Sequence, residues 1–147
     1  MAKLELQNAY RSVKIHPSNY AATGLKSKFS KDSNVTYMVD TRLPFGASQS
    51  PNTFHRLTQA VREIMRKKGY DTIIVYLDDF LIVGSTYQEC QEALFALMKL
   101  VRELGFQINY NKVEGPTQKL TFLGLELNST SMTISIPQGK LQDTEKL

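Results

Sequence analysis

Cysteine is almost absent from this sequence, and long apolar runs are absent altogether. Cys90 is the only cysteine among 147 residues, which excludes an internal disulfide and a cysteine-rich zinc site. We therefore expect a reducing, intracellular location, either cytoplasm or nucleus. No stretch approaches the roughly 20 apolar residues that a membrane-spanning helix needs, and the N-terminal MAKLELQNAYR lacks the apolar core of a signal peptide. We expect no membrane partner.

The composition is that of an ordinary globular protein, with 41% hydrophobic and 22% charged residues. The length fits a single domain over residues 1–147, and the opening MAK is typical of an expression start joined to part of a longer chain. Of the net charge of +4, the excess lies in residues 1–42, which carry 7 basic and 3 acidic groups. A basic face attracts nucleic acid, although a solvated surface explains the charge equally well.

Turn signals divide the N-terminal part into a strand and a hairpin. Residues 4–15 are interpreted as a strand that runs into a turn at residues 16–19, His-Pro-Ser-Asn. Residues 21–42 predict a basic hairpin with a polar loop at residues 30–34.

Two amphipathic helices are predicted next. The first begins with Ser50 as N-cap and Pro51 as first helical residue, and it stops at Gly69. The second opens with a capping box of Thr86 and Glu89 and ends at Gly105. The apolar stripes consist of Phe54, Leu57, Val61, Ile64 and Met65, and of Cys90, Leu94, Leu97, Met98, Val101 and Leu104, whereas His55, Arg56, Arg62, Arg66 and Lys67 give the first helix a basic face.

The C-terminal segment is rich in strand signals. Residues 106–112 predict a short strand and loop, and residues 119–137 predict a hairpin that turns at residues 128–131. Because the helices lie between strand pairs, the pattern predicts an α+β fold in which two helices pack on one face of an antiparallel sheet.

The stretch TIIVYLDDFLIVG places Asp78 and Asp79 between two apolar runs. Neighbouring residues of a strand point to opposite faces, so the two acids can share a site only where the chain turns. Surface turn acids are the ordinary alternative, but the apolar flanks favour a hairpin tip that presents carboxylates to a hard cation. Mg²⁺ is usually held by one or two carboxylates with substrate phosphates. A further acid from another strand is then expected, and Glu5 provides it.

These segments together resemble the palm of a reverse transcriptase. LELQNAYRSV resembles the first palm motif of that family, LPFGASQSPNTF the second, YLDD the third, the Lys112 region the fourth and FLGLEL the fifth. The five motifs occur in the family's order over nearly the whole chain, and this conjunction is far more specific than YLDD alone. LPFG, YLDDFLIVG, GFQINYNK and SMTISIP most resemble the DIRS-like, tyrosine-recombinase retrotransposon group. The resemblance implies a polymerase palm fold, with residues 21–42 as a hairpin derived from the fingers.

The resemblance also implies an RNA-directed DNA polymerase core that adds a dNTP to a primer 3′ end on an RNA or DNA template. Two Mg²⁺ ions, with Mn²⁺ as a substitute, would serve this reaction. Asp78 is implied to be a direct metal ligand, Asp79 its less directly coordinated neighbour and Glu5 the other principal ligand. Lys112 is implied to lie near the leaving pyrophosphate, although a solvated lysine is the ordinary interpretation.

The remaining implied positions surround the nucleotide and the primer. The Leu6 carbonyl would help to hold the triphosphate-bound ion, and Tyr10 would lie under the sugar as a gate against a 2′-hydroxyl. Phe45 and Gly46 would form the wall and floor of the nucleotide pocket, and Gln49 would touch template or nucleotide. The primer grip would consist of Phe122, Leu123 and Gly124. By residue type alone, Tyr10 is an ordinary core tyrosine and the grip is a strand with a bend.

Two departures from the family pattern bear on activity. The first palm acid of the family is Asp, whereas this chain has Glu5, and a misplacement of about 1 Å can cost on the order of 100-fold in rate. The N-terminal fingers and the thumb are also expected to lie outside this chain, in the full-length protein. We therefore expect weak or no activity from it alone. The alternative is a catalytically silent palm that binds nucleic acid or a protein; self-association through apolar patches is a third interpretation.

Overall fold

A computed structural model of the chain describes residues 1–31 and 34–137. Positions 32–33 of the predicted hairpin loop, and residues 138–147 of the predicted domain, lie outside the described residues. The elements in chain order are β1 (Ala2–Gln7), α1 (Ala9–Ser12), η1 (Pro17–Thr23), β2 (Gly24–Ser27), β3 (Thr36–Val39), α2 (Ser50–Lys67), β4 (Ile73–Tyr76), β5 (Asp79–Ile82), α3 (Tyr87–Glu103), β6 (Gln107–Ile108), η2 (Tyr110–Lys112), β7 (Lys119–Phe122), β8 (Leu125–Asn128) and β9 (Thr133–Ser135).

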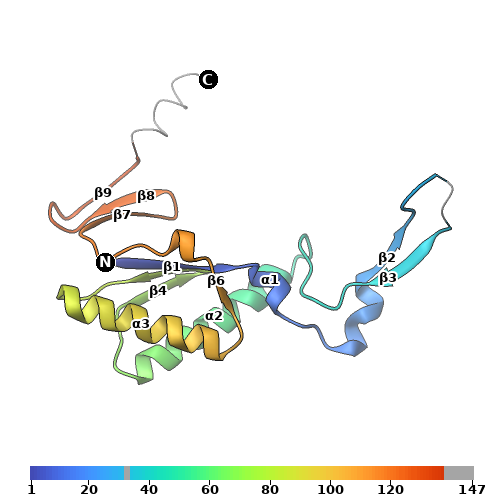
Figure 1. Cartoon of the computed structure of the whole chain (residues 1–147), viewed down its shortest axis with the longest axis horizontal. Coiled ribbons are helices and arrows are strands. Elements are labelled where there is room, and N and C mark those ends of the chain that lie inside the picture. Colours follow the sequence, from blue (N-terminus) through green and yellow to red (C-terminus); the bar gives the residue numbers. More distant parts are fainter. Residues whose placement is uncertain (32–33, 138–147) are drawn as a thin grey trace, which may run out of the picture.

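A four-stranded antiparallel sheet with the order β4-β5-β1-β6 forms the centre of the molecule. Helices α2 and α3 cover one face of this sheet (Figure 1). Strand β1 alternates between buried and partly exposed residues, as expected for a sheet with one covered face. The predicted α+β fold with two helices on one face is therefore confirmed. The largest fully buried side chains include Phe54, Phe80, Leu4, Leu6, Met65, Ile73 and Ile82.

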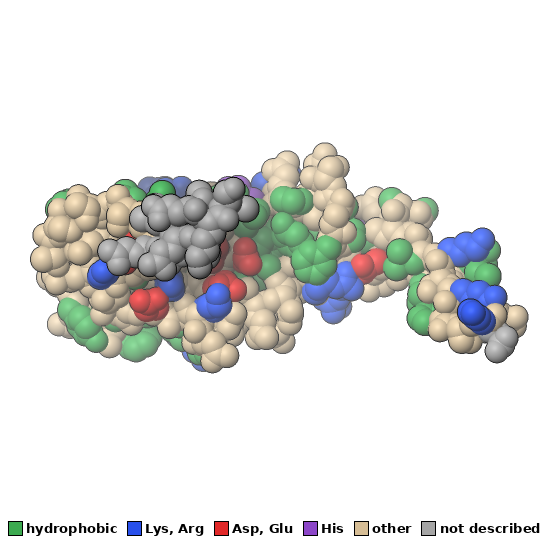
Figure 2. Space-filling view, turned by 90° about the horizontal axis from the view of Figure 1, so that it is seen from above, with side chains coloured by type: hydrophobic (Ala, Val, Ile, Leu, Met, Phe, Trp, Pro, Cys, Tyr) green, Lys and Arg blue, Asp and Glu red, His purple; other side chains and the backbone are tan. Residues whose placement is uncertain are grey.

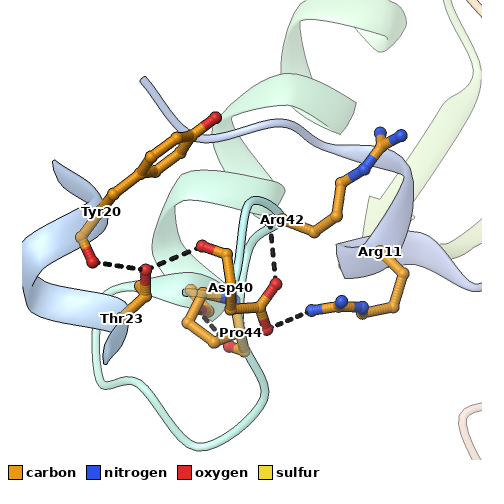
Figure 3. A network of polar contacts seen from close by, with 7 residues as sticks. Arg11, Tyr20, Thr23, Asp40, Arg42 and Pro44 are labelled. Carbon is orange, nitrogen blue, oxygen red and sulfur yellow. Dashed lines mark hydrogen bonds and ion pairs between the residues drawn. The ribbon is translucent and has the colours of Figure 1, made fainter. Parts of the chain in front are cut away.

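The predicted hairpin within residues 21–42 is present, but its strands are shorter than expected. Strands β2 and β3 pair antiparallel and extend away from the central sheet (Figure 1), and η1 precedes them. Asp40 fixes the base of this hairpin (Figure 3): its carboxylate accepts from Arg11 Nη1 at 2.5 Å and from the Arg42 amide at 2.9 Å. Thr23 Oγ1 donates to the Asp40 carbonyl at 2.7 Å and to the Tyr20 carbonyl at 3.1 Å. The contact with Arg11 links the hairpin to α1, and it lowers the pKa of Asp40.

Two predictions about the N-terminal half are wrong. The strand predicted over residues 4–15 ends at Gln7, because Asn8 turns the chain into the left-handed region at φ 52° and α1 follows. Asn is one of the few residues that adopt this conformation at low cost. Ser50 does not cap α2, because Gln49 is the N-cap residue. Ser50 is instead buried, and its Oγ donates to the carbonyl of Pro44 (Figure 3) at 2.6 Å.

The C-terminal prediction is also incomplete. Residues 119–128 form a hairpin of their own, β7–β8, that turns at Leu123 and Gly124, and β9 then adds to it after the turn predicted near residues 128–131. Both turn residues have positive φ, 49° and 79°, which is the geometry of a two-residue hairpin turn. The sequence did not predict this turn, because leucine rarely adopts positive φ.

The capping box of α3 is confirmed. The Glu89 amide donates to Thr86 Oγ1 at 3.1 Å, and the Glu89 carboxylate accepts from the Ser85 amide at 2.8 Å. The residue before this cap, Gly84, has to be a glycine, because a Cβ at that position would lie 2.6 Å from the Cys90 amide nitrogen. None of the helices within the described residues is long and apolar enough to cross a membrane.

Candidate functional site

The YLDD sequence forms the turn between β4 and β5. Tyr76 pairs with Asp79, so Leu77 and Asp78 are the two turn residues. Leu77 has a φ of 52°, a conformation that costs a non-glycine residue about 1 kcal/mol or more and requires support from neighbouring groups. One support comes from β1, where the Leu6 amide donates to the Asp78 carbonyl at 2.9 Å. The turn is thereby attached to the strand that carries Glu5.

Strand register brings two of the predicted acids together. In the antiparallel pairing of β1 with β5, Glu5 lies opposite Asp79 and Leu4 opposite Phe80. Leu4 and Phe80 are buried under the helices, and directly opposed residues share a face of the sheet. Glu5 and Asp79 therefore lie side by side on the face away from the helices, and Asp78 lies at the adjacent turn.

This arrangement raises the pKa values of both aspartates. Partial burial is the main cause of the raised pKa of Asp78, and the charge of Glu5 adds to it. The pKa of Asp79 rises to about 6, first through burial and then through the charges of Asp78 and Glu5. Lys112 and Lys3 oppose this rise only in part. The site thus concentrates more negative charge than its own cations neutralise.

The carboxylate of Glu5 is oriented by the segment that follows α3. Asn109 Nδ2 donates to Glu5 Oε1 at 3.3 Å, and Lys112 Nζ lies 3.8 Å from Glu5 Oε2. The Asn109 amide also donates to the Glu5 carbonyl at 2.9 Å. The motif predicted around Lys112 therefore contacts the first acid directly. Asn109 was missed because its role depends on the pairing of β6 with β1.

Two cavities meet at the acids. The first, called here the Asp79 cavity, has a volume of about 270 Å³ and is lined by Lys3, Leu4, Glu5, Asp79, Lys112, Thr121, Phe122, Leu123 and Gly124. The second, the Asp78 cavity, has a volume of about 360 Å³ and is lined by Glu5, Leu6, Gln7, Asn8, Ala9, Tyr10, Phe45, Asp78 and Asn109. Glu5 lines both. The structure therefore collects the predicted grip residues and Lys112 in one cavity, and Leu6, Tyr10 and Phe45 in the other, whereas Gly46 and Gln49 line neither.

Aromatic packing fixes one wall of the Asp78 cavity. The ring of Tyr10 lies 5.3 Å from that of Phe45 and 5.4 Å from that of Phe54, measured between centroids. Phe54 in turn makes an edge-to-face contact with Phe106 at 6.2 Å. Because Phe54 is fully buried, this row joins Tyr10 to the hydrophobic core and restricts the movement of its ring.

Lys3 fixes the wall of the Asp79 cavity that β7 provides. Its Nζ donates to the Thr121 carbonyl at 2.8 Å and pairs with the Glu114 carboxylate at 2.8 Å. This positioning residue was not predicted, although its place two residues before Glu5 puts it on the same face of β1. His55 on α2, predicted only as part of a basic face, also contacts the site through the Leu77 amide.

The donor set fits a cation that substrate atoms help to hold. Within residues 1–31 and 34–137, no three His, Cys, Asp or Glu side chains lie close enough together to hold a metal ion by themselves. Mg²⁺, however, is commonly bound through one or two carboxylates plus substrate phosphates. The raised pKa values of Asp78 and Asp79 show that an added cation would relieve repulsion there.

Charged side chains are distributed unevenly over the molecule. Figure 2 shows several acidic side chains near the middle of the view and basic side chains at the far end, on the β2–β3 hairpin.

Comparison with known proteins identifies the family. Residues 1–127 match the family model described as "Reverse transcriptase (RNA-dependent DNA polymerase)". The chain belongs to the reverse transcriptase family. Its relatives include the Gag-Pol polyprotein of Koala retrovirus, 25% identical over 82% of this chain, and Protein P of Duck hepatitis B virus, 25% identical over 89%. The chain spans only 7% and 15% of the lengths of these two proteins.

Solved structures of other reverse transcriptases share the fold. A foamy viral protease-reverse transcriptase in complex with double-stranded DNA superposes with a TM-score of 0.81 at 21% identity, over 99% of this chain and 24% of the other. The same type of protein in complex with an RNA/DNA hybrid gives 0.78 at 23% identity, over 98% and 18%. At this identity the likeness concerns the fold, and it confirms the reverse transcriptase palm. Reverse transcriptases in general use divalent metal ions.

The raised pKa of Asp79 predicts a pH-dependent effect on stability. Because the pKa in the folded state, about 6, exceeds the ordinary value of 3.8, the folded protein binds more protons between these values, and its free energy of unfolding falls as pH rises through that window. We expect Asp79→Asn to raise the free energy of unfolding near pH 7.5 by on the order of 1 kcal/mol after solvent screening, and to have little effect near pH 4.

Urea unfolding of both proteins at the two pH values measures this difference. Asp71→Asn, at an exposed acid before β4, is the matched control and should show no such pH-dependent gain. An Asp79→Asn protein that is no more stable than the parent near pH 7.5 contradicts the prediction.

Proposed function

We propose that this chain is the palm of an RNA-directed DNA polymerase, which adds a dNTP to a primer 3′ end on an RNA or DNA template. The observation that carries the proposal is the position of the three acids where the two cavities meet. Leu6, Tyr10 and Phe45, three of the positions matched to nucleotide binding, line the Asp78 cavity, and the positions matched to the primer grip line the Asp79 cavity. A nucleotide and a primer end in these cavities would meet at the carboxylates. Neighbours solved with double-stranded DNA and with an RNA/DNA hybrid support nucleic-acid partners.

In this proposal, different residues of the chain act in each of the two cavities. Asp78, Asp79 and Glu5 would hold two divalent ions, Mg²⁺ or Mn²⁺, which would activate the primer hydroxyl and stabilise the triphosphate. Tyr10, restrained between Phe45 and Phe54, excludes a sugar that carries a 2′-hydroxyl.

The grip residues Phe122, Leu123 and Gly124 lie across the Asp79 cavity and would orient the primer end. Lys112, whose side chain is 61% exposed, has room to move from Glu5 toward a leaving pyrophosphate. Gly46 and Gln49, outside both cavities, would act on the template side.

The first acid provides the sharpest test of the proposal. Glu5→Asp should raise primer extension by about 10- to 100-fold, because it removes the methylene that displaces the carboxylate. Asp78→Asn should abolish extension by at least about 100-fold, because it removes a charge from the metal site. Extension is measured on an RNA template with Mg²⁺ and with Mn²⁺, for this chain and for the chain joined to fingers and thumb segments.

Glu103→Asp, at an exposed position of α3, shortens a glutamate away from the site and should leave extension unchanged. If Glu5→Asp gains nothing even with fingers and thumb present, the role proposed for position 5 is wrong. If Asp78→Asn retains full extension, the proposed catalytic centre is wrong.

A catalytically silent palm that binds nucleic acid is the second candidate function. The observation that favours it is Glu5 itself, whose carboxylate is engaged by Asn109 and Lys112. The β2–β3 hairpin, which carries basic side chains at one end of the view in Figure 2, then provides the binding surface. Lys26 and Lys28 are exposed in this segment.

Binding governed by phosphate contacts depends steeply on salt. The affinity for a primer–template should fall at least about tenfold between 50 and 200 mM salt. Changing both Lys26 and Lys28 to Gln should reduce this slope, whereas Lys99→Gln on α3 should not. Fluorescence anisotropy measures both quantities, and a salt-independent affinity indicates a protein partner instead.

We also propose that the chain derives from a retroelement of the DIRS-like, tyrosine-recombinase group. The combination of LPFG, YLDDFLIVG, GFQINYNK and SMTISIP supports this origin. The expected observation is a tyrosine-recombinase reading frame in the same genomic element. An integrase frame of the retroviral type in that place would contradict the subgroup.

A further inference from the structure

The Leu77–Asp78 turn is supported from two sides, and only one of them belongs to the sheet. Strand β1 holds the Asp78 carbonyl through the Leu6 amide at 2.9 Å. On the other side, the Leu77 amide donates to Nδ1 of His55 at 3.3 Å, across from helix α2. The His55 ring also packs near that of Tyr76, with centroids 6.4 Å apart. A helix side chain thus contacts the backbone immediately before Asp78.

The bond to Leu77 determines the tautomer of His55. A backbone amide can only donate, so Nδ1 must carry a lone pair, and the neutral imidazole then bears its proton on Nε2. As the structure orients it, Gln59 presents its side-chain nitrogen to His55 Nε2 at 3.0 Å, and its Oε1 accepts from Arg62 Nη1 at 3.4 Å. The Nε2–H tautomer therefore requires the Gln59 amide to turn by 180°, which places its oxygen at His55 Nε2.

We propose that His55 is a positioning residue for the proposed polymerase site. It accepts from the Leu77 amide, holds that residue at its φ of 52°, and thereby fixes the direction in which the Asp78 carboxylate projects. Leu77 is a non-glycine residue in a sparsely populated conformation, which persists only where surrounding contacts enforce it. The proposal rests on the proposed function for its catalytic consequence, but its structural part is independent of activity.

Two variants of the full chain separate the acceptor from the bulk of the side chain. His55→Leu removes the acceptor and keeps an apolar side chain, whereas His55→Asn retains an acceptor oxygen close to the place of Nδ1. The NMR readouts are hydrogen exchange of the Leu77 amide and the ¹⁵N shifts of the His55 ring, which report the tautomer. Mn²⁺ titration with paramagnetic broadening around Asp78 reports the metal site, and thermal unfolding checks that each variant is folded.

We expect the parent to show the Nε2–H tautomer. In His55→Leu, Leu77 amide exchange should accelerate and Mn²⁺ should bind more weakly, each by about tenfold, the effect of losing roughly one net hydrogen bond. His55→Asn should restore both to within about threefold of the parent. His16→Leu, at the only other histidine, should change neither. Where primer extension is measurable, it should follow the order parent, His55→Asn, His55→Leu.

Three results would overturn the positioning role: an Nδ1–H tautomer in the parent, unchanged Leu77 exchange in His55→Leu, or a His55→Asn protein as impaired as His55→Leu. These readouts do not require turnover. If Asp78→Asn retains full extension in the chain joined to fingers and thumb, while the parent shows the expected tautomer, exchange and rescue, the proposed function fails and the positioning role stands. If the parent extends primers and the His55 variants leave hydrogen exchange of the Leu77 amide unchanged, only the positioning role fails.

Discussion

The antiparallel pairing of β1 with β5 determines both the core and the candidate site. Because side chains alternate along each strand, burying Leu4 opposite Phe80 under the helices places Glu5 opposite Asp79 on the face away from the helices. A slip of one residue would turn the acids toward the core and the buried apolar side chains away from it, so core burial strongly disfavours that register. The free energy that stabilises the core therefore also holds the carboxylates together.

The site itself opposes folding in two ways. Repulsion and partial burial raise the pKa of Asp79 to about 6, and Leu77 occupies a left-handed conformation at the adjacent turn. Lys3 and Lys112 offset only part of the negative charge. Groups that disfavour the folded state persist only where the surrounding structure compensates them, and such groups cluster at functional sites. Here the buried side chains of β1, β4 and β5 beside the turn provide that compensation.

Features set by neighbouring residues could be predicted from the sequence, and features set by distant partners could not. The capping box of Thr86 forms within one helical turn, and it was found. The burial of Ser50, by contrast, depends on a carbonyl in the preceding loop, and the contact of His55 depends on Leu77, which lies 22 residues away. The acids were predicted through their motifs, but their apposition follows from strand register, which only the pairing with β5 specifies.

The ion pair between Lys112 and Glu5 is too weak to explain a silent site by itself. Its nitrogen–oxygen distance is 3.8 Å, and the two side chains are 61% and 31% exposed. Exposed pairs of this kind contribute about 0–1 kcal/mol. Under the proposed function, divalent cations held at the acids would relieve their repulsion and would displace Lys112 from Glu5. Under the proposed function, the limit on the site would instead be the position of the Glu5 carboxylate, one methylene further from its backbone than an aspartate would be, since Mg²⁺ demands near-octahedral geometry.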